Sequence, residues 1–226
     1  MQNRLLLRFS PEDQTAMGEP TLVQFKLRDL LETAGEKPEY VYFIEDGVAS
    51  TVTTLAERSA EVGVTGREGF IGSGLVDGDD HIVLSSMMQV AGTANRYGID
   101  QTRAALARSP AMDRLLRRYV KSFALQVSST VWANGRALLE ARLARWLLMV
   151  SDRVGPKFEI THEFIAIMLA TRRSGVTLAL QTLEGRGLIR STRGLVTVVD
   201  REGMIELADG SYGMAEAEHE RLMALQ

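Results

Sequence analysis

The spacing of apolar residues changes near residue 100, and this change most limits what the chain can fold into. Between residues 21 and 98, short runs of β-forming residues are separated by glycines, in the stretches "TLVQFKL", "YVYFIEDGVAS", "AEVGVTGREGFIG", "GLVDGDDHIVL" and "SSMMQVAG". Runs of this length and spacing predict a β-barrel or a two-layer β-roll. From Asp100 onward the apolar spacing is helical. We therefore expect an α+β protein with a jelly-roll-like β-roll first and a helical part second.

A long helix is expected directly after the roll. The stretch "DQTRAALARSP" predicts a short helix that Pro110 ends, and residues 111–136 contain no proline and no glycine before Gly135. An apolar stripe on this long helix repeats at alternating steps of four and three residues, through Leu116, Val120, Phe123, Val127 and Thr130. Such a repeat is typical of a seam between two helices.

Two interpretations of this stripe stay open. The helix could pack on the roll of its own chain, or it could pair with the same helix of a second copy. Pairing is favoured because Met112, Leu115 and Tyr119 form another apolar face that could cover the roll. The sequence therefore predicts a β-roll over residues 1–108, a dimerisation helix over 109–136 and a third region over 137–226.

The third region has the spacing of a helix-turn-helix. Ala166 is small where two helices would touch, Ala170 is small in the turn, and Val176 would anchor the second helix. Thr161 is expected to cap the first helix. The second helix is expected to begin near Arg172, so that its first turn points outward. The predicted DNA contacts on these two helices are Thr161, Arg172, Arg173, Ser174 and Thr177.

A β-hairpin is expected directly after the second helix. In "GLIRSTRGLVTVVD" two short β-runs flank a turn at Arg193-Gly194, which is typical of the wing of a winged helix. Arg190 and Arg193 would lie near its tip, beside the phosphate backbone of DNA. Residues 142–203 hold ten Lys and Arg against six Asp and Glu, whereas the whole chain has a net charge of −3. A locally basic module in an acidic chain favours double-stranded DNA as the partner.

Taken with those motifs, the chain resembles the family of the cyclic-AMP receptor protein and the fumarate–nitrate reduction regulator. The resemblance covers nearly the whole chain and is most specific in "RLARWLLM", "TRRSGVT", "LEGRGLIR", "DREG" and "SYG". It implies a β-roll like a cyclic-nucleotide-binding domain, a long dimerisation helix and a winged helix-turn-helix. It also implies a homodimer that binds a palindromic operator and regulates transcription together with RNA polymerase.

Two departures from the family pattern concern the turn and the effector site. Ala170 stands where the family usually has a glycine, so the turn is expected to be slightly strained or differently closed. Ser73 and His81-Ile82 stand where cyclic-nucleotide-binding members have a glutamate and an Arg-Ser pair. Cyclic AMP in its usual pose is therefore not expected, because a buried phosphate needs a fixed cation. An unknown effector stays open, with Ser73, His81, Ser128 and Ser129 as candidate pocket residues.

Other functions are weighed against the same residues. The chain has no cysteine, which excludes disulfides and cysteine-ligated iron–sulfur clusters, and its three histidines do not have the spacing of a metal site. Haem ligation through His81 and a non-DNA interaction module remain as alternatives. The sequence shows no nucleophile elbow and no phosphate-binding loop, so an enzyme is not expected. No cofactor is expected, and the absence of a long apolar run favours a cytoplasmic protein without a membrane span.

Overall fold

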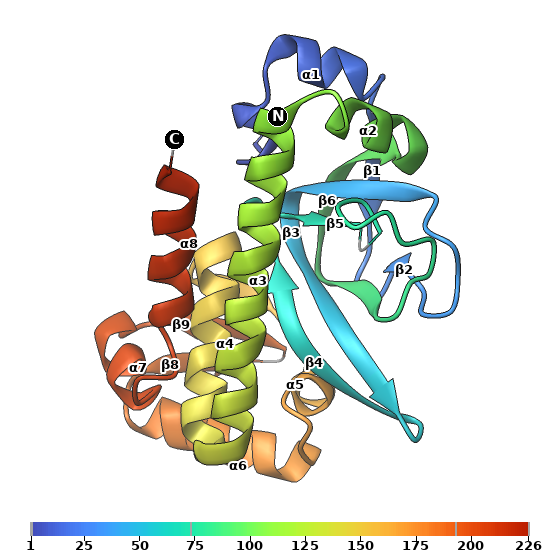
Figure 1. The fold of residues 1–226 in the computed structure, drawn as a ribbon. Coiled ribbons are helices and arrows are strands. Elements are labelled where there is room, and N and C mark those ends of the chain that lie inside the picture. The colour runs from blue at the N-terminus through green and yellow to red at the C-terminus, as the bar shows by residue number, and fades with distance from the viewer. Residues whose placement is uncertain (1, 73, 193, 226) are drawn as a thin grey trace. The chain divides into compact units, whose positions relative to one another are not determined.

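The computed structural model describes residues 2–72, 74–192 and 194–225. The chain divides into two compact units. The roll unit comprises Met1–Val52 and Thr65–Lys121, and the helical unit comprises Thr53–Val64 and Ser122–Gln226. Both helices and sheets are present, as the sequence predicted, and Figure 1 labels the elements in chain order.

The first six strands of the chain form a single sheet. It contains β1 (Thr21–Phe25), β2 (Leu30–Glu32), β3 (Tyr40–Leu55), β4 (Arg58–Thr65), β5 (Phe70–Ile71) and β6 (Ser85–Gly98). The main order is β1-β6-β3-β4, with β2 on β6 and β5 on β3. Gly47 lies at an irregularity inside β3, where the pairing with β6 shifts register. A Cβ at Gly47 would lie 2.5 Å from the Val90 carbonyl oxygen, so the close approach of the two strands requires glycine.

The strand predicted over residues 74–84 is wrong. This segment is a run of turns and irregular backbone between β5 and β6. Its aspartates bind the backbone locally, because Asp77 accepts from the Asp79 amide at 3.0 Å and Asp79 accepts from the His81 amide at 3.1 Å. Arg103 donates to the carbonyl of Asp79 at 2.7 Å. These bonds give the backbone partners other than a neighbouring strand.

Apolar side chains of the sheet form one core cluster of the roll. The cluster contains Phe25, Leu31, Tyr42, Ile44, Ala49, Ile71, Met88 and Ala94. A 3₁₀ turn (Leu6–Arg8) and the short helices α1 (Pro11–Ala16) and α2 (Ile99–Leu106) complete the unit together with the first part of α3. Within this unit Tyr119 of α3 lies 2.8 Å from the Thr65 hydroxyl and stacks near Phe70, with ring centroids 5.1 Å apart.

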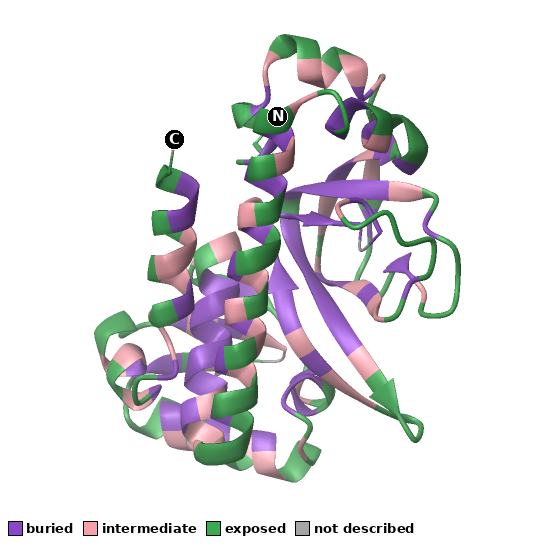
Figure 2. Ribbon diagram, viewed as in Figure 1, coloured by how far each residue is buried: buried purple, intermediate pink, exposed green. Residues whose placement is uncertain are grey.

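The predicted long helix is α3 (Pro110–Arg136), and it is continuous. It is followed by α4 (Leu139–Val154), which Gly155 ends with a φ of 90°. Helix α4 is the core of the helical unit, and Figure 2 shows it buried along most of its length. Arg145 of α4 is only 5% exposed, and its guanidinium donates to the Ser211 and Gln126 carbonyls at 2.9 and 3.3 Å. Burial lowers the pKa of Arg145.

The rest of the helical unit is a small sheet with four helices. The elements are β7 (Lys157–Glu159), α5 (His162–Met168), α6 (Arg173–Gly185), β8 (Ile189–Thr192), β9 (Leu195–Val198), α7 (Arg201–Leu207) and α8 (Met214–Ala224). The sheet order is β7-β9-β8. The elements β7, α7 and α8 were not predicted from the sequence. Helix α8 is linked to α3 by His219 and Ser122, whose Nδ1 and Oγ atoms are 3.0 Å apart.

The end of the β3–β4 hairpin belongs to the helical unit. Trp146 of α4 is 2% exposed and donates from Nε1 to Glu61 of β4 at 3.0 Å. Gln126 of α3 bonds both the amide and the carbonyl of Val64, at 2.6 and 3.1 Å. Among the residues described, none of the helices combines the length and the apolar character that a membrane span requires.

Candidate nucleic-acid interface

Helices α5 and α6 form the predicted helix-turn-helix. Thr161 caps α5, with its hydroxyl oxygen accepting from the Phe164 amide at 3.2 Å. In the turn, the Thr171 amide donates to the Ala166 carbonyl at 2.8 Å. Ala170 has a φ of 46°, so the turn does use a left-handed residue at the position where this chain lacks glycine. The residues predicted to lie between the two helices are buried, since Val176 is 0% exposed and Ala166 is 7% exposed.

Arg142 of α4 contacts the helix-turn-helix next to its turn. Its guanidinium donates to the Leu169 carbonyl at the C-terminal end of α5. That carbonyl is one of those that a helix leaves without a partner of its own. Burial lowers the pKa of Arg142. In the sequence Arg142 contributes to the basic balance and begins the motif "RLARWLLM", but nothing in its spacing indicates the residue that it contacts.

The first turn of α6 presents the predicted DNA contacts to solvent. Arg172 is the N-cap residue, and its carbonyl accepts from the Val176 amide at 3.2 Å. Arg172, Arg173 and Ser174 are all exposed. The N-terminal end of a helix carries partial positive charge, so the two guanidinium groups and the helix favour an anionic partner together.

Thr177 differs from these three residues because it also joins the two helices. Its hydroxyl donates to the Arg173 carbonyl at 3.1 Å and lies 3.0 Å from Nδ1 of His162 on α5. Because the Thr177 hydroxyl donates its proton to the Arg173 carbonyl, it accepts from His162, whose Nδ1 atom therefore carries the hydrogen. Thr177 is half-buried, and its first role is to hold α6 against α5.

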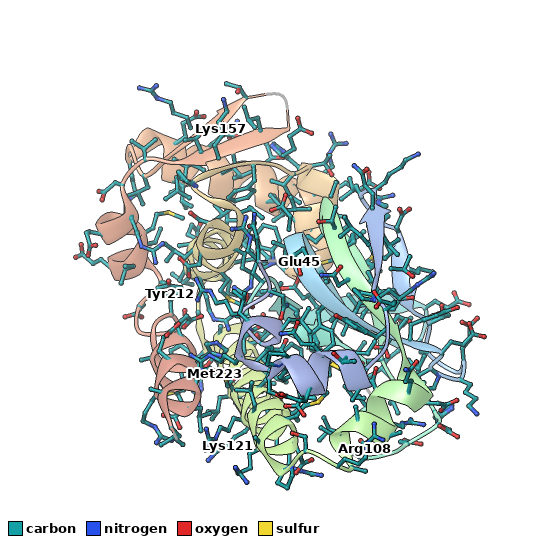
Figure 3. The ribbon with its side chains drawn as sticks, turned by 90° about the horizontal axis from the view of Figure 1, so that it is seen from above. Glu45, Arg108, Lys121, Lys157, Tyr212 and Met223 are labelled. Carbon is teal, nitrogen blue, oxygen red and sulfur yellow. The ribbon has the colours of Figure 1, made fainter. Side chains whose placement is uncertain are left out.

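The wing is the hairpin of β8 and β9. The two strands pair from Ile189↔Val198 to Thr192↔Leu195. Arg190 is exposed on β8, and the neighbouring Ser191 amide donates to Glu184 of α6 at 2.9 Å, which ties the wing to the second helix. Arg193, the other predicted wing contact, lies outside the described residues. Lys157 on β7, labelled in Figure 3, is a further exposed cation on the same sheet.

The predicted seam residues of α3 differ in how far their own chain covers them. Leu116 is fully buried within its own chain, and Phe123 is half-buried against Gly63 of β4. Thr130 donates to the Gln126 carbonyl at 3.0 Å and is half-buried. Val120 is 45% exposed, whereas Val127 is half-buried. The stripe that is open to solvent runs through Val120, Ala124, Ser128 and Val131. Leu116 therefore cannot be an exposed seam residue, since its own chain already covers it.

The candidate effector residues differ in their exposure. Ser73 lies outside the described residues. His81 is exposed, and Ser128 is exposed on α3. Ser129 is buried, with its hydroxyl donating to the Leu125 carbonyl at 3.1 Å. The described residues contain no group of three metal-ligand side chains.

An arginine that was not predicted as a site residue lies on the same face of the roll's sheet as Tyr42. Arg96 of β6 pairs directly with Tyr42 of β3, so the two side chains share a face of the sheet. Its guanidinium carbon is 4.2 Å from the centroid of the Tyr40 ring. Burial raises the pKa of Tyr42, while the charge of Arg96 acts in the opposite direction. The Arg96 Nε atom is buried and has no hydrogen-bond partner among the described residues. Only the strand register brings these residues together.

Comparison with known proteins agrees with this geometry. Residues 141–207 match the Crp-like helix-turn-helix domain family. FixK2 from Bradyrhizobium japonicum superposes with a TM-score of 0.72 at 17% identity, covering 84% of this chain and 97% of its own. A Crp-family transcriptional regulator from Thermus thermophilus gives a TM-score of 0.70 at 20% identity, covering 83% of this chain and 97% of its own.

A third solved structure is the c-di-GMP responsive global regulator CLP of Xanthomonas campestris. It gives a TM-score of 0.67 at 14% identity, covering 84% of this chain and 99% of its own. No curated protein matches the chain. These structural similarities establish the fold of both units, and the family match locates the DNA-binding domain within the helical unit.

Proposed function

We propose that the chain is a DNA-binding transcriptional regulator of the Crp/Fnr family, which acts as a homodimer and binds a palindromic operator through α6 and the wing. The exposed Arg172 and Arg173 at the start of α6 carry this proposal. In a helix-turn-helix the first turn of the second helix enters the major groove, where arginine can pair with guanine O6 and N7. The regulator would act in the cytoplasm and contact RNA polymerase.

The proposed dimer seam follows the solvent-facing side of α3 and includes the half-buried Val127 in place of Ser128. Val120, Ala124, Val127 and Val131 follow one another at steps of four, three and four residues. This is the repeat of a two-helix seam, and its members are exposed or half-buried in the single chain. A two-fold axis along this stripe would present two copies of α6 to two half-sites of DNA.

The test separates base reading from phosphate contact. The preferred duplex is first selected from a random library with the wild-type protein. Arg172→Ala or Arg173→Ala should then weaken the selected duplex by about 1–3 kcal/mol and random DNA much less. Arg190→Ala on the wing should weaken both equally and lower the slope of log K against log salt by about one unit. A protein that enriches no duplex and binds no DNA would instead be an interaction module with solvated charges.

A second candidate function is the sensing of a small anionic ligand by the roll, and Arg96 favours it. A half-buried guanidinium stacked on Tyr40, with an unbonded Nε, is a suitable partner for a carboxylate or phosphate. Thermal unfolding with inorganic phosphate and with succinate tests this proposal. One of the two should raise the unfolding temperature of the wild type and not of Arg96→Met. The exposed Lys37→Met serves as the control. Equal shifts in all three proteins would remove Arg96 from the proposal.

A further inference from the structure

The outward side of α6 carries a leucine among polar residues. Leu178 is 62% exposed, whereas Val176, Ala179 and Leu180 around it in sequence are buried. Ser174 lies four residues before Leu178 and Gln181 lies three residues after it, and both are exposed. Residues at these spacings are neighbours on one side of a helix. The three side chains therefore form one outward stripe that continues from the first turn of α6.

Exposure of a leucine alone is ordinary, but its place on this helix is not. A single exposed apolar side chain needs no explanation on a protein surface. This one lies in the second turn of the helix whose first turn holds Arg172 and Arg173. A helix that enters the major groove with its first turn brings the next outward turn over the base edges as well. Leu178 would then face bases rather than phosphates.

The chemistry of leucine limits which base it can face. A leucine side chain has no hydrogen-bond donor or acceptor, so it cannot satisfy the acceptors of guanine or the donor of cytosine in the major groove. Covering such groups without replacing their bonds to water is unfavourable. Thymine is the one standard base that presents a methyl group there. We propose that Leu178 selects a thymine in each half-site through an apolar contact with its 5-methyl group.

This inference rests on the proposed function, and one chemical change tests it directly. Replacing thymine by deoxyuridine removes only the methyl group. Burial of one methyl group is worth about fourfold in affinity (about 0.8 kcal/mol), so a symmetric change in both half-sites should cost about 15-fold. The measurement is fluorescence anisotropy on the duplex selected by the wild-type protein, with each thymine replaced in turn.

The expected result is a double-mutant cycle with strong coupling at one thymine per half-site. The wild type should lose about 15-fold there, whereas Leu178→Ala should bind the thymine and deoxyuridine duplexes equally. Leu178→Met should keep the methyl dependence, because methionine offers a similar apolar contact. Leu22→Ala is the matched control, since Leu22 on β1 of the roll is 65% exposed, and it should behave as the wild type.

Two failures are distinguishable. If the wild type selects a duplex but tolerates every methyl removal, or if Leu178→Ala loses as much as the wild type, the thymine contact is wrong and the proposed function stands. If the wild type selects no duplex at all, the proposed function itself fails. Because Leu178 is 62% exposed, unchanged thermal unfolding of Leu178→Ala is expected, and this measurement checks that the fold is intact.

Discussion

A glutamate at position 120 should dissociate the dimer without unfolding the chain. Val120 lies on the open stripe of α3 and is 45% exposed in the single chain, so its replacement leaves the chain's own core in place. Leu116, one turn earlier, is fully buried, and the same change there would unfold the roll unit instead. The same substitution at the two positions should therefore have different effects: loss of the dimer at Val120 and loss of the fold at Leu116.

The size of the effect follows from burial and charge. Complete burial of a valine side chain stabilises by about 1.5 kcal/mol, so the 45% of Val120 that remains exposed is worth about 0.7 kcal/mol in each protomer. A two-fold seam contains this contact twice, which gives about 1.4 kcal/mol. Two carboxylates brought to about 6 Å at an effective dielectric constant of about 20 repel by about 3 kcal/mol. The sum of about 4 kcal/mol raises the dimer dissociation constant about 1,000-fold.

Sedimentation equilibrium at micromolar concentration measures this change. Val120→Glu should sediment as a monomer where the wild type is a dimer, and its thermal unfolding in the monomeric state should show an intact fold. Leu22→Glu places the same charge on an exposed leucine of β1 and should remain dimeric. An unchanged dimer for Val120→Glu would mean that α3 does not form the seam through this stripe.

Three further predictions concern single side chains. Ala170→Gly should stabilise the chain by about 0.5–1 kcal/mol in urea unfolding, because the φ of 46° strains alanine. A lower urea midpoint for the variant would show that alanine is not strained in this turn. Tyr212 (labelled in Figure 3) donates to Asp152 and accepts from Arg201, both at 2.6 Å, so Tyr212→Phe should cost about 1–2 kcal/mol at pH 7. Burial, with help from Asp152, raises the pKa of Tyr212, so its contribution is present below about pH 10 and the difference between the two proteins should shrink above that pH. Calorimetry with cyclic AMP should show no binding at physiological concentration, because His81 is an exposed imidazole where a fixed cation is needed; a tight stoichiometric heat would contradict this.

The helix-turn-helix could be predicted because its signals are local. Ala166, Ala170 and Val176 lie within eleven residues of one another, and each acts on a neighbouring turn of the chain. The false strand over 74–84 has the opposite cause. Its apolar residues form two short runs next to glycine and turn residues, as in many strands, but Asp77 and Asp79 bind nearby amides and Arg103 holds the segment from a helix farther along the chain. A pattern of apolar residues carries no information about such bonds.

The sequence could not separate the proposed seam from the chain's own core, because α3 is apolar on more than one side. The sets that begin at Leu116 and at Val120 both repeat at steps of four and three residues, and Val120 and Val127 belong to both. Spacing alone cannot decide which phase the chain covers by itself. Burial decides it, since Leu116 is enclosed and Val131 is 67% exposed. Arg96 and Tyr42 could not be paired for a similar reason, because only the β3–β6 register joins two positions so far apart in the chain.

The outward surface of α6 combines two chemistries that respond differently to salt. In the proposed complex Arg172 and Arg173 of the first turn would contact phosphates and guanine edges. Phosphate contacts displace counterions, so their contribution should fall as the salt concentration rises. A contact between Leu178 and a thymine methyl releases no ion. Affinity for every duplex should therefore fall with salt along parallel lines, while the ratio of affinities for the thymine and deoxyuridine duplexes stays at about 15 from low to high salt. Anisotropy titrations of both duplexes at three salt concentrations measure this ratio. A ratio that fell together with the affinity would mean that the methyl group acts through the position of the arginines, and Leu178 would then be a spacer rather than a reader.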